Sequence, residues 1–342
     1  MREWKGFVHG INLGGWYSQC DYSKDRLDNF IKEDDISRIA DWGFDHLRLP
    51  VDYDIILSKD GSVTDDGLCR IQKAVDWCGG HGLNLLIDLH KTPGYSFDAQ
   101  EGESGFFSSE RYQELFYTIW ESFASNFGKY GDRIAFDLLN EVTDKELLPA
   151  WERISSECIR RIRKTCPDTK IVLGSYWYNS VRAVKDLKGP FDENTVLGFH
   201  CYDPQFFTHQ RAYWQPMMPA DFESVYPVSY GYGAEMTKKI YGDDTLITGY
   251  DEEAVMSPGF FEKLFKDAVD TAAKFDLPLY CGEYGVIDRA DLDSTLNWYR
   301  DIHKVFKEYG IGHALWSYKE MDFGFGDERM DPVRKDILDS NT

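Results

Sequence analysis

The sequence lacks the features that mark membrane proteins, multidomain chains and phosphate-binding folds. No stretch approaches the roughly eighteen consecutive apolar residues that a membrane-spanning helix needs, so no membrane partner is expected. No Pro/Gly/Ser-rich or low-complexity linker divides the 342 residues. Neither GxGxxG nor GxxxxGK[ST] follows any apolar run, which counts against a nucleotide-binding sheet. A single domain spanning residues 1–342 is therefore predicted.

Cysteine is scarce and shows no pairing pattern. The 7 cysteines are an odd number and none has CxxC spacing, which indicates a protein that is reduced or indifferent to disulfides. Residues Met1–Gly6 show no cationic start followed by an apolar stretch, so they do not form a signal peptide. We expect a cytoplasmic protein, or a secreted one whose leader has been removed.

Positive charge is in deficit. With 38 Lys and Arg against 59 Asp and Glu, the net charge is −21. Such a protein repels phosphate backbones and polyanionic polysaccharides, so nucleic acid is not an expected partner and a neutral substrate fits. Aromatic residues make up 15% of the chain. They form either a large core or, in part, a cleft whose rings stack on sugars or bases.

Short apolar runs alternate with helical patterns along the whole chain. Several runs are almost wholly apolar, as parallel strands covered on both faces are. The expected strands are 7–13, 44–49, 83–89, 134–139, 170–174, 195–199, 277–281 and 311–316. The expected helices are 32–42, 65–78, 108–130, 145–165, 258–275, 292–309 and about 332–338. This alternation predicts a closed (β/α)8 TIM barrel, with an open doubly wound sheet as the alternative.

The segment from Asp203 to about Ser257 breaks the alternation. It contains no convincing strand–helix unit and is rich in aromatic residues. Long irregular segments in compact domains are usually functional or form small subdomains. We expect residues 203–257 to form a small subdomain or lid inserted after the sixth strand. Most of its rings should pack together, while Phe207 and Trp214 should contact the substrate or the cleft wall.

Polar side chains gather at the predicted strand ends. In a (β/α)8 barrel the functional groups lie at the C-terminal ends of the strands. The residues at these ends are Arg48, Asp88, His90, Asn140, Glu141, His200, Tyr202, Glu283 and Trp316. Each has an ordinary packing explanation by itself. Buried polar groups are costly unless paired, however, so their collection on one rim indicates a functional site.

Two carboxylates in this set suggest a reaction. Glu141 and Glu283 follow the fourth and seventh strands, whose ends face each other across the barrel mouth. Glycoside hydrolysis needs such a pair: one carboxylic acid protonates the leaving oxygen, and the other attacks the sugar or directs water. A separation of about 5–5.5 Å would imply a nucleophile and retention of configuration.

The whole set resembles that of glycoside hydrolase family 5, the cellulase-type (β/α)8 barrels of clan A. The strongest motif is Leu-Leu-Asn-Glu at 138–141, and the second is Gly-Glu-Tyr-Gly at 282–285. The order of motifs is kept from Gly-Ile-Asn-Leu-Gly-Gly-Trp at 10–16 to Trp316. Within the family, the chain resembles the clostridial endoglucanase C type through Asn-Leu-Gly-Gly-Trp, Phe-Phe-Thr-His-Gln at 206–210 and the segment inserted there.

The resemblance implies a role for each carboxyl group. Glu141 would be the acid/base, and Glu283 the nucleophile. A carboxyl group near an ionised carboxylate has a raised pKa, which agrees with a protonated Glu141 near neutral pH. Asn140 would bind the 2-hydroxyl of the sugar in the −1 subsite.

The resemblance also implies roles for the surrounding residues. Arg48 and Tyr202 would hold Glu283 by hydrogen bonds and keep it ionised. His90 and His200 would line the −1 subsite, with His200 close to Glu141. Trp316 would be the floor on which the sugar stacks.

The predicted activity is that of a retaining, endo-acting β-glucanase that cleaves β-1,4 bonds in β-1,4-glucan and in mixed β-1,3/1,4-glucan. We expect a monomer without cofactor or metal whose partner is a β-glucan or cello-oligosaccharide. The alternatives are an exo-β-1,3-glucanase, a mannanase or a xyloglucanase of the same family. Two others are a non-catalytic sugar-binding barrel and a hydrolase whose metal is held by Asp88, His90, His200, Glu141 and Glu283.

Overall fold

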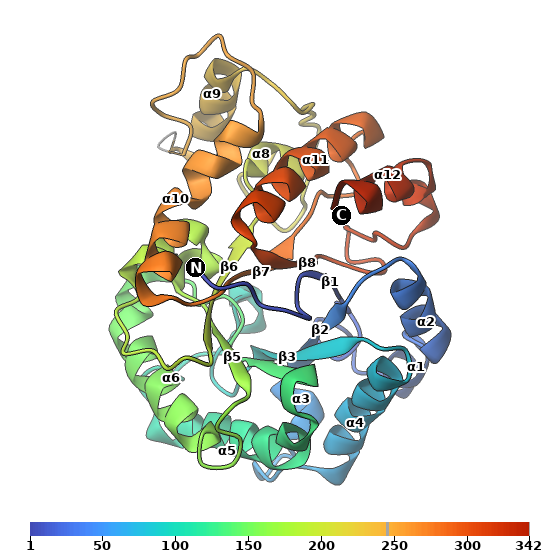
Figure 1. The fold of residues 1–342 in the computed structure, drawn as a ribbon, viewed down its shortest axis with the longest axis vertical. Coiled ribbons are helices and arrows are strands. Elements are labelled where there is room, and N and C mark those ends of the chain that lie inside the picture. Colours follow the sequence, from blue (N-terminus) through green and yellow to red (C-terminus); the bar gives the residue numbers. More distant parts are fainter. Residues whose placement is uncertain (244–245, 342) are drawn as a thin grey trace.

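A closed barrel of parallel strands in sequence order forms the centre of the protein (Figure 1). The computed structural model describes residues 1–243 and 246–341; residues 244–245 of the predicted insertion and residue 342 lie outside the described residues. The strands are β1 (His9–Asn12), β2 (His46–Asp52), β3 (Asn84–Lys91), β4 (Ile134–Asp137), β5 (Lys170–Leu173), β6 (Thr195–Cys201), β7 (Leu279–Tyr284) and β8 (Gly312–Leu315). The predicted (β/α)8 barrel is confirmed, and the open doubly wound sheet is wrong.

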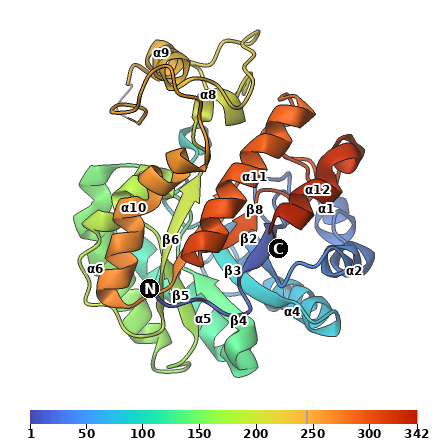
Figure 2. The same ribbon diagram turned by 45° about the horizontal axis from the view of Figure 1, so that its top comes forward.

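Helices surround the barrel (Figures 1 and 2). The longer ones are α2 (Glu33–Asp41), α4 (Asp65–Gly80), α5 (Glu110–Phe127), α6 (Leu148–Ile162), α9 (Tyr230–Tyr241), α10 (Pro258–Phe275), α11 (Leu292–Tyr309) and α12 (Asp331–Asn341). The shorter ones are α1 (Lys24–Asn29), α3 (Tyr53–Ile56), α7 (Tyr176–Asn179) and α8 (Gln205–Thr208). Short 3₁₀ helices cover Ala99–Glu101, Gly128–Arg133, Lys145–Leu147, Val181–Asp186 and Glu328–Met330. Among the described residues, no helix combines the length and apolar character needed to cross a membrane.

Local sequence signals set the helix boundaries. The Thr64 side chain accepts a hydrogen bond from Gly67 N at the start of α4, and Ser109 does the same for Tyr112 N at the start of α5. Helix α11 ends at Gly310, whose φ of 65° lies in the left-handed region that glycine adopts without steric cost. The helices therefore stop where the chain must turn back to the next strand.

Side chains fill the barrel interior near the N-terminal ends of the strands. A buried cluster joins interior-facing strand residues to two rings from the N-terminal segment: Trp4, Phe7, Leu86, Ala135, Val172, Val196, Tyr280 and Ala314. Trp4 and Phe7 stack with their ring centroids 4.3 Å apart. This plug closes the N-terminal face, so the polar residues of the interior meet at the C-terminal face.

The chain between β6 and α10 leaves the barrel beside the polar rim. Helix α8 begins this segment, and α9 stands clear of the ring of helices beyond the end of β6 (Figure 2). The segment is attached to the rest of the protein: Ile287 N donates to Thr208 O at 3.0 Å, and the Tyr226 hydroxyl donates to Asp301 Oδ2 at 2.9 Å. These contacts hold it against α11 and the loop that follows β7.

Candidate active site

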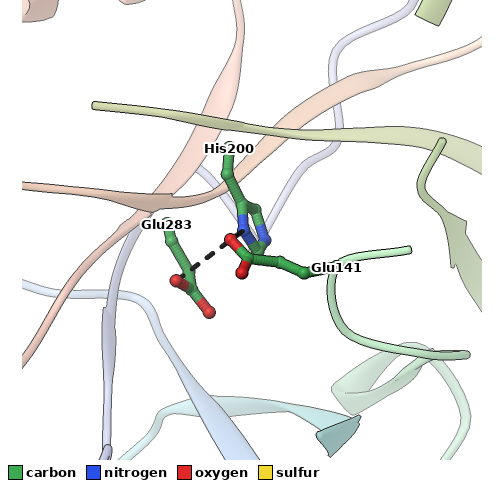
Figure 3. Close-up of side chains that lie close together, drawn as sticks. All are labelled: Glu141, His200 and Glu283. Atoms are coloured by element: carbon green, nitrogen blue, oxygen red, sulfur yellow. Dashed lines mark hydrogen bonds and ion pairs between the residues drawn. The ribbon is translucent and has the colours of Figure 1, made fainter. Parts of the chain in front are cut away.

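Glu141 and Glu283 lie side by side at the carboxyl end of the barrel. Glu141 follows β4 and Glu283 lies near the end of β7, so the barrel brings together residues far apart in sequence. One oxygen of each carboxyl group and one ring nitrogen of His200 all lie within 4.8 Å of one another (Figure 3). Glu141 is 9% exposed and Glu283 is 5% exposed. The two carboxyl groups therefore share one small site that is largely closed to solvent.

Arg48, on β2, is the cation of this site and is fully buried. Its Nη1 donates to Glu283 Oε1 at 2.7 Å and to Asn12 Oδ1 at 3.1 Å. Its Nη2 donates to Asn140 Oδ1 at 3.1 Å and pairs with Asp88 Oδ1 at 3.1 Å. Its Nε donates to Asp137 Oδ2 at 3.0 Å. Four side-chain hydrogen bonds and the ion pair with Asp88 thus hold all three guanidinium nitrogens in place.

Glu283 is held by donors on both oxygens. Arg48 donates to Oε1, and the Tyr202 hydroxyl donates to Oε2 at 2.9 Å. Burial raises the pKa of Glu283 above its usual value, and the Arg48 charge and the Tyr202 hydrogen bond offset part of this rise. The two donors also hold the carboxyl group in the position from which it faces Glu141.

Glu141 has a different environment. Its Oε1 lies 2.8 Å from His200 Nδ1, and its backbone carbonyl accepts a hydrogen bond from the Tyr95 hydroxyl at 2.7 Å. Burial raises its pKa well above the usual value, and the neighbouring Glu283 charge raises it further. Burial also lowers the pKa of His200 well below its usual value, so this ring is neutral. Of the two carboxyl groups, Glu141 has the surroundings that favour the protonated form more strongly.

The backbone at Glu141 is strained. Its φ of 45° lies in the left-handed region that residues with a Cβ seldom adopt. The Tyr95 hydroxyl bridges this point, because it donates to Glu141 O and accepts from Thr143 N at 2.9 Å. Such conformations persist where the surroundings enforce them, and they collect at functional sites.

His90 and Asn140 form one wall of the site. His90 Nδ1 lies 2.6 Å from Asp88 Oδ2, and its Nε2 lies 3.4 Å from Asn140 Nδ2. Burial lowers the pKa of His90 to about 4, so it is a neutral ring whose Nδ1–H donates to Asp88. This leaves the Nε2 face of the ring and the Asn140 amide turned toward the same side of the site.

Trp316 follows β8 and stands parallel to His90. The two ring planes differ by 6° and their centroids are 5.7 Å apart. Trp316 belongs to a cluster with Ala212, Ile287 and Phe323, against which Tyr202, Trp214 and Met321 also pack. Ten residues were predicted to act in catalysis or substrate binding, and the structure brings eight of them to one rim: Arg48, His90, Asn140, Glu141, His200, Tyr202, Glu283 and Trp316.

Two predictions in the segment after β6 have different outcomes. Trp214 is half-buried, 6.3 Å from Phe323 between ring centroids, and lies in the same cluster as Trp316. Phe207 is fully buried, and its ring packs 5.6 Å from that of Tyr226. Phe207 is therefore closed to direct contact with a substrate, and its predicted contact with the cleft wall stays a prediction. Its position on α8 turns the ring into the core, where a sugar cannot reach it.

Sequence reasoning missed three residues of the site. Asn12 donates to Gly282 O at 2.9 Å and accepts from Arg48, so it joins β1 to β7. Asp137 pairs with Arg48, and Tyr95 braces the backbone of Glu141. Asn12 lies near the C-terminal end of the first strand, which is the kind of position that identified the predicted site residues. Asp137 and Tyr95 carry no such signal.

Among the described residues, one group of side chains has the spacing of a metal site: Glu141, His200 and Glu283. The donor set argues against a cation at this place. Arg48 Nη1 already lies 2.7 Å from Glu283 Oε1, and a second positive charge there would be repelled. The residues present thus fit proton transfer by a carboxyl group better than metal ligation.

Comparison with known proteins agrees with this geometry. The profile of the family described as Cellulase (glycosyl hydrolase family 5) matches residues 4–322. Cellodextrinase A of Ruminococcus flavefaciens is 49% identical over 311 residues, which are 91% of this chain and 85% of the relative. Endoglucanase C of Acetivibrio thermocellus is 38% identical over 336 residues, which are 97% of each chain.

A solved structure shows the same fold. It is the clostridial cellulose synthase subunit Z of Clostridioides difficile, with a TM-score of 0.77 and 24% identity. The match covers 98% of this chain and 99% of that chain.

Proposed function

The chain belongs to glycoside hydrolase family 5, and on this premise we propose that it is a retaining β-glucanase. It cleaves β-1,4-glucosidic bonds inside β-1,4-glucan and mixed β-1,3/1,4-glucan by double displacement. The names of its relatives, a cellodextrinase and an endoglucanase, support β-1,4-linked glucose as the substrate. The −21 net charge suits a neutral glucan.

The carboxyl separation is the observation that carries the retaining mechanism. Oxygens of Glu141 and Glu283 lie within 4.8 Å. Retaining glycosidases place the two carboxyl groups about 5–5.5 Å apart, and inverting ones about 6.5–9.5 Å apart to admit a water molecule. A spacing this short supports direct attack by Glu283 on the anomeric carbon over attack by an intervening water molecule.

In the first step, a Glu283 carboxylate oxygen bonds to the anomeric carbon while the glycosidic C–O bond breaks. The proton of Glu141 passes to the departing oxygen. The product is a glycosyl ester of Glu283 and a free leaving-group sugar. Arg48 and Tyr202 orient Glu283 for the attack by holding its two oxygens.

In the second step, Glu141 takes a proton from water as the water oxygen bonds to the anomeric carbon. The ester bond to Glu283 breaks and the carboxylate is restored. Esterification has removed the Glu283 charge, so the main charge that raised the pKa of Glu141 is gone. Glu141 has given its proton to the leaving group in the first step, and its lowered pKa helps it to stay ionised until it acts as the base. Two inversions give net retention.

The remaining rim residues form the subsite for the sugar that is attacked. Asn140 binds its 2-hydroxyl, His90 and His200 line its sides, and Trp316 stacks on its face. Trp214 extends this aromatic surface, since it packs in the same cluster as Trp316.

The segment 203–257 forms a fixed wall of the cleft, as part of one catalytic domain over residues 1–342. The contacts Thr208–Ile287 and Tyr226–Asp301 support a docked wall more than a swinging lid. We propose a monomer as the active unit, since the barrel of one chain closes around both carboxyl groups.

A substrate panel tests the proposal. Hydrolysis is measured on barley mixed-linkage glucan, carboxymethyl cellulose, laminarin and mannan, with the Glu283→Gln variant as the inactive control. We expect activity on the first two, and a rapid loss of viscosity that marks internal cleavage. Activity confined to laminarin or mannan would instead establish one of the other family specificities. Full activity of Glu283→Gln would contradict the mechanism.

A further inference from the structure

A cavity of about 680 Å³ lies between the segment 203–257 and the loop that follows β7. Arg211, Glu223 and Tyr232 of the segment line one side, and Arg289 and Ala290 of the loop line the other. This volume is in the range of pockets that bind small molecules. The proposed mechanism uses none of the residues that line this cavity, which we call the insertion pocket.

Hydrogen bonds hold the walls of the insertion pocket in place. Arg211 Nη1 donates to Glu223 Oε1 at 2.9 Å, and its Nη2 donates to the backbone carbonyl of Arg289 across the pocket. Gln210 Oε1 accepts from Ser224 N, and Gln210 Nε2 donates to Ser224 O, both at 3.1 Å. The pocket is therefore preformed, which lowers the entropic cost of binding a ligand.

Two features of the lining call for an explanation other than packing. The φ of Arg211 is 60°, in the left-handed region that residues with a Cβ seldom adopt, and such strain collects at ligand sites. Among the described residues, Arg211 Nε and Arg289 Nη1 are buried and have no hydrogen-bond partner, although Arg289 Nη1 pairs with Asp288 Oδ1 at 3.3 Å. Unpaired buried donors are rare in native proteins, so both features indicate a binding site.

The apolar side chains of the pocket remain partly in water. Tyr232 is 37% exposed, Val225 is 57% exposed and Val228 is half-buried. Aromatic and aliphatic faces left open in a preformed pocket provide a surface for the C–H face of a ligand.

The charged side chains of the pocket largely neutralise one another. Arg211 pairs with Glu223 at 2.9 Å, and Arg289 pairs with Asp322 at 2.6 Å. Both arginine side chains are 29% exposed, so a ligand in the pocket can reach them. Open apolar faces beside paired charges suit a neutral ligand that has both C–H faces and hydroxyl groups, as a glucose unit has.

Building on the proposed function, we propose that the insertion pocket is a second, non-catalytic binding site for β-glucan. A glucose unit lies with its C–H face against Tyr232, and its hydroxyl oxygens accept hydrogen bonds from the Arg211 and Arg289 side chains. Ala212, next to Arg211 in the chain, packs in the same cluster as Trp316 on the cleft side of this wall. The pocket therefore keeps glucan near the cleft and raises its effective concentration there.

The test follows the methyl signals of labelled valines by NMR in the Glu283→Gln variant, in which glucan should bind without being cleaved. Val228 lines the insertion pocket, whereas Val142 directly follows Glu141 and reports on the cleft. During a titration with cellotetraose both signals should shift, each with its own midpoint. Val333 on α12 lies at neither site and should not shift.

Two substitutions in the same background separate the sites. Tyr232→Ala removes the ring on which the sugar stacks, and Val225→Asp places a charge on the apolar wall. In each, the dissociation constant read at Val228 should rise roughly five-fold or more, as the loss of one stacked ring predicts. The constant read at Val142 should stay within about two-fold. Met217→Ala removes an exposed apolar side chain of the same segment that does not line the pocket, and as the matched control it should change neither constant.

Three results would overturn the assignment. The first is no shift at Val228, and the second is a shift whose midpoint equals that of Val142 in every variant, which would mean that Val228 senses the cleft from a distance. The third is a shift with inorganic phosphate and none with cellotetraose, which would make the pocket an anion site. Failure of the proposed function is recognised separately, since Val142 would then not respond to cellotetraose.

Discussion

At the scale of single residues, Glu141 and Glu283 are the same chemical group in unequal surroundings. Glu283 receives hydrogen bonds from a cation and a phenol, and Glu141 faces a neutral imidazole. Environments that separate the pKa values of two carboxyl groups assign one as the acid and the other as the nucleophile. The proposed roles of Glu141 as acid/base and Glu283 as nucleophile therefore follow from the neighbours of each group.

The first prediction concerns proton donation by Glu141. In Glu141→Ala, hydrolysis of natural glucan should fall by at least roughly 100-fold, as expected for loss of a general acid. Formation of the glycosyl-enzyme from a dinitrophenyl cellobioside should be largely spared, because that leaving group needs no proton. Added azide should then accelerate turnover and yield a β-glycosyl azide. Steady-state kinetics on both substrates are the measurement, and an equal loss on the two would refute the assignment.

The second prediction concerns the charge coupling between the pair. The Glu283 charge raises the pKa of Glu141, so Glu283→Gln should lower it. Titration of carbon-13-labelled glutamate by NMR should place the Glu141 midpoint at lower pH in the variant than in the wild type. Correspondingly, the alkaline limb of kcat/KM in the wild type marks the ionisation of Glu141. An unchanged or higher midpoint would mean that the two groups do not interact.

The third prediction concerns Asp137, whose single hydrogen-bond partner among the described residues is Arg48. Burial raises the pKa of Asp137 to about 7, so keeping this carboxylate ionised costs free energy. We infer that its role is to orient Arg48 toward Glu283. Asp137→Ala should lower kcat roughly ten-fold or more with little change in KM, since a misdirected guanidinium misplaces the nucleophile. Asp137→Asn should recover most of the rate, because its amide oxygen accepts from Nε. Equal losses in both variants would show that the charge, rather than the orientation, matters.

At the scale of elements, apolar runs predicted the strands well and irregular segments poorly. All eight strands lie where they were expected, and α10 and α11 have the predicted bounds, 258–275 and 292–309. Burial on both faces makes a barrel strand a continuous apolar run, which sequence shows directly. The rim position of Glu141 and Glu283 followed from those strand ends.

Helix α9 was missed because its sequence argues against a helix. It begins Tyr-Gly-Tyr-Gly, and glycine and aromatic residues have weak helix propensity. One signal was present: Ser229 caps the helix by accepting from Tyr232 N. The left-handed turn at Trp177, where φ is 53°, could not be foreseen at all, because it depends on the hydrogen bond from Trp177 N to Thr143 O in the loop after β4.

The fourth prediction separates two aromatic residues of the segment 203–257. Trp214→Ala should raise KM for long glucans several-fold and change it less for the shortest cleavable oligosaccharide, with a small change in melting temperature. Phe207→Ala should lower the melting temperature by many degrees, since removal of a buried ring costs about 3–5 kcal/mol. Its kinetics per folded molecule should match the wild type. A large loss of stability with unchanged kinetics in Trp214→Ala would make Trp214 a packing residue.

At the scale of the whole molecule, barrel closure explains how distant residues meet. Asn12 on β1 and Gly282 on β7 are joined by a hydrogen bond of 2.9 Å, and β8 lies between their strands. The order of the strands could be predicted from the alternating pattern. The five contacts of Arg48 could not, because they depend on side-chain positions around the closed ring.

The stereochemistry of the first product tests the central claim most directly. Proton NMR of a reaction on cellotetraose, recorded before mutarotation, should show the β-anomer at the new reducing end. That result is expected because oxygens of Glu141 and Glu283 lie within 4.8 Å, a spacing that fits double displacement with Glu283 as the proposed nucleophile. An initial α-anomer would mean a single displacement by water and would contradict the account.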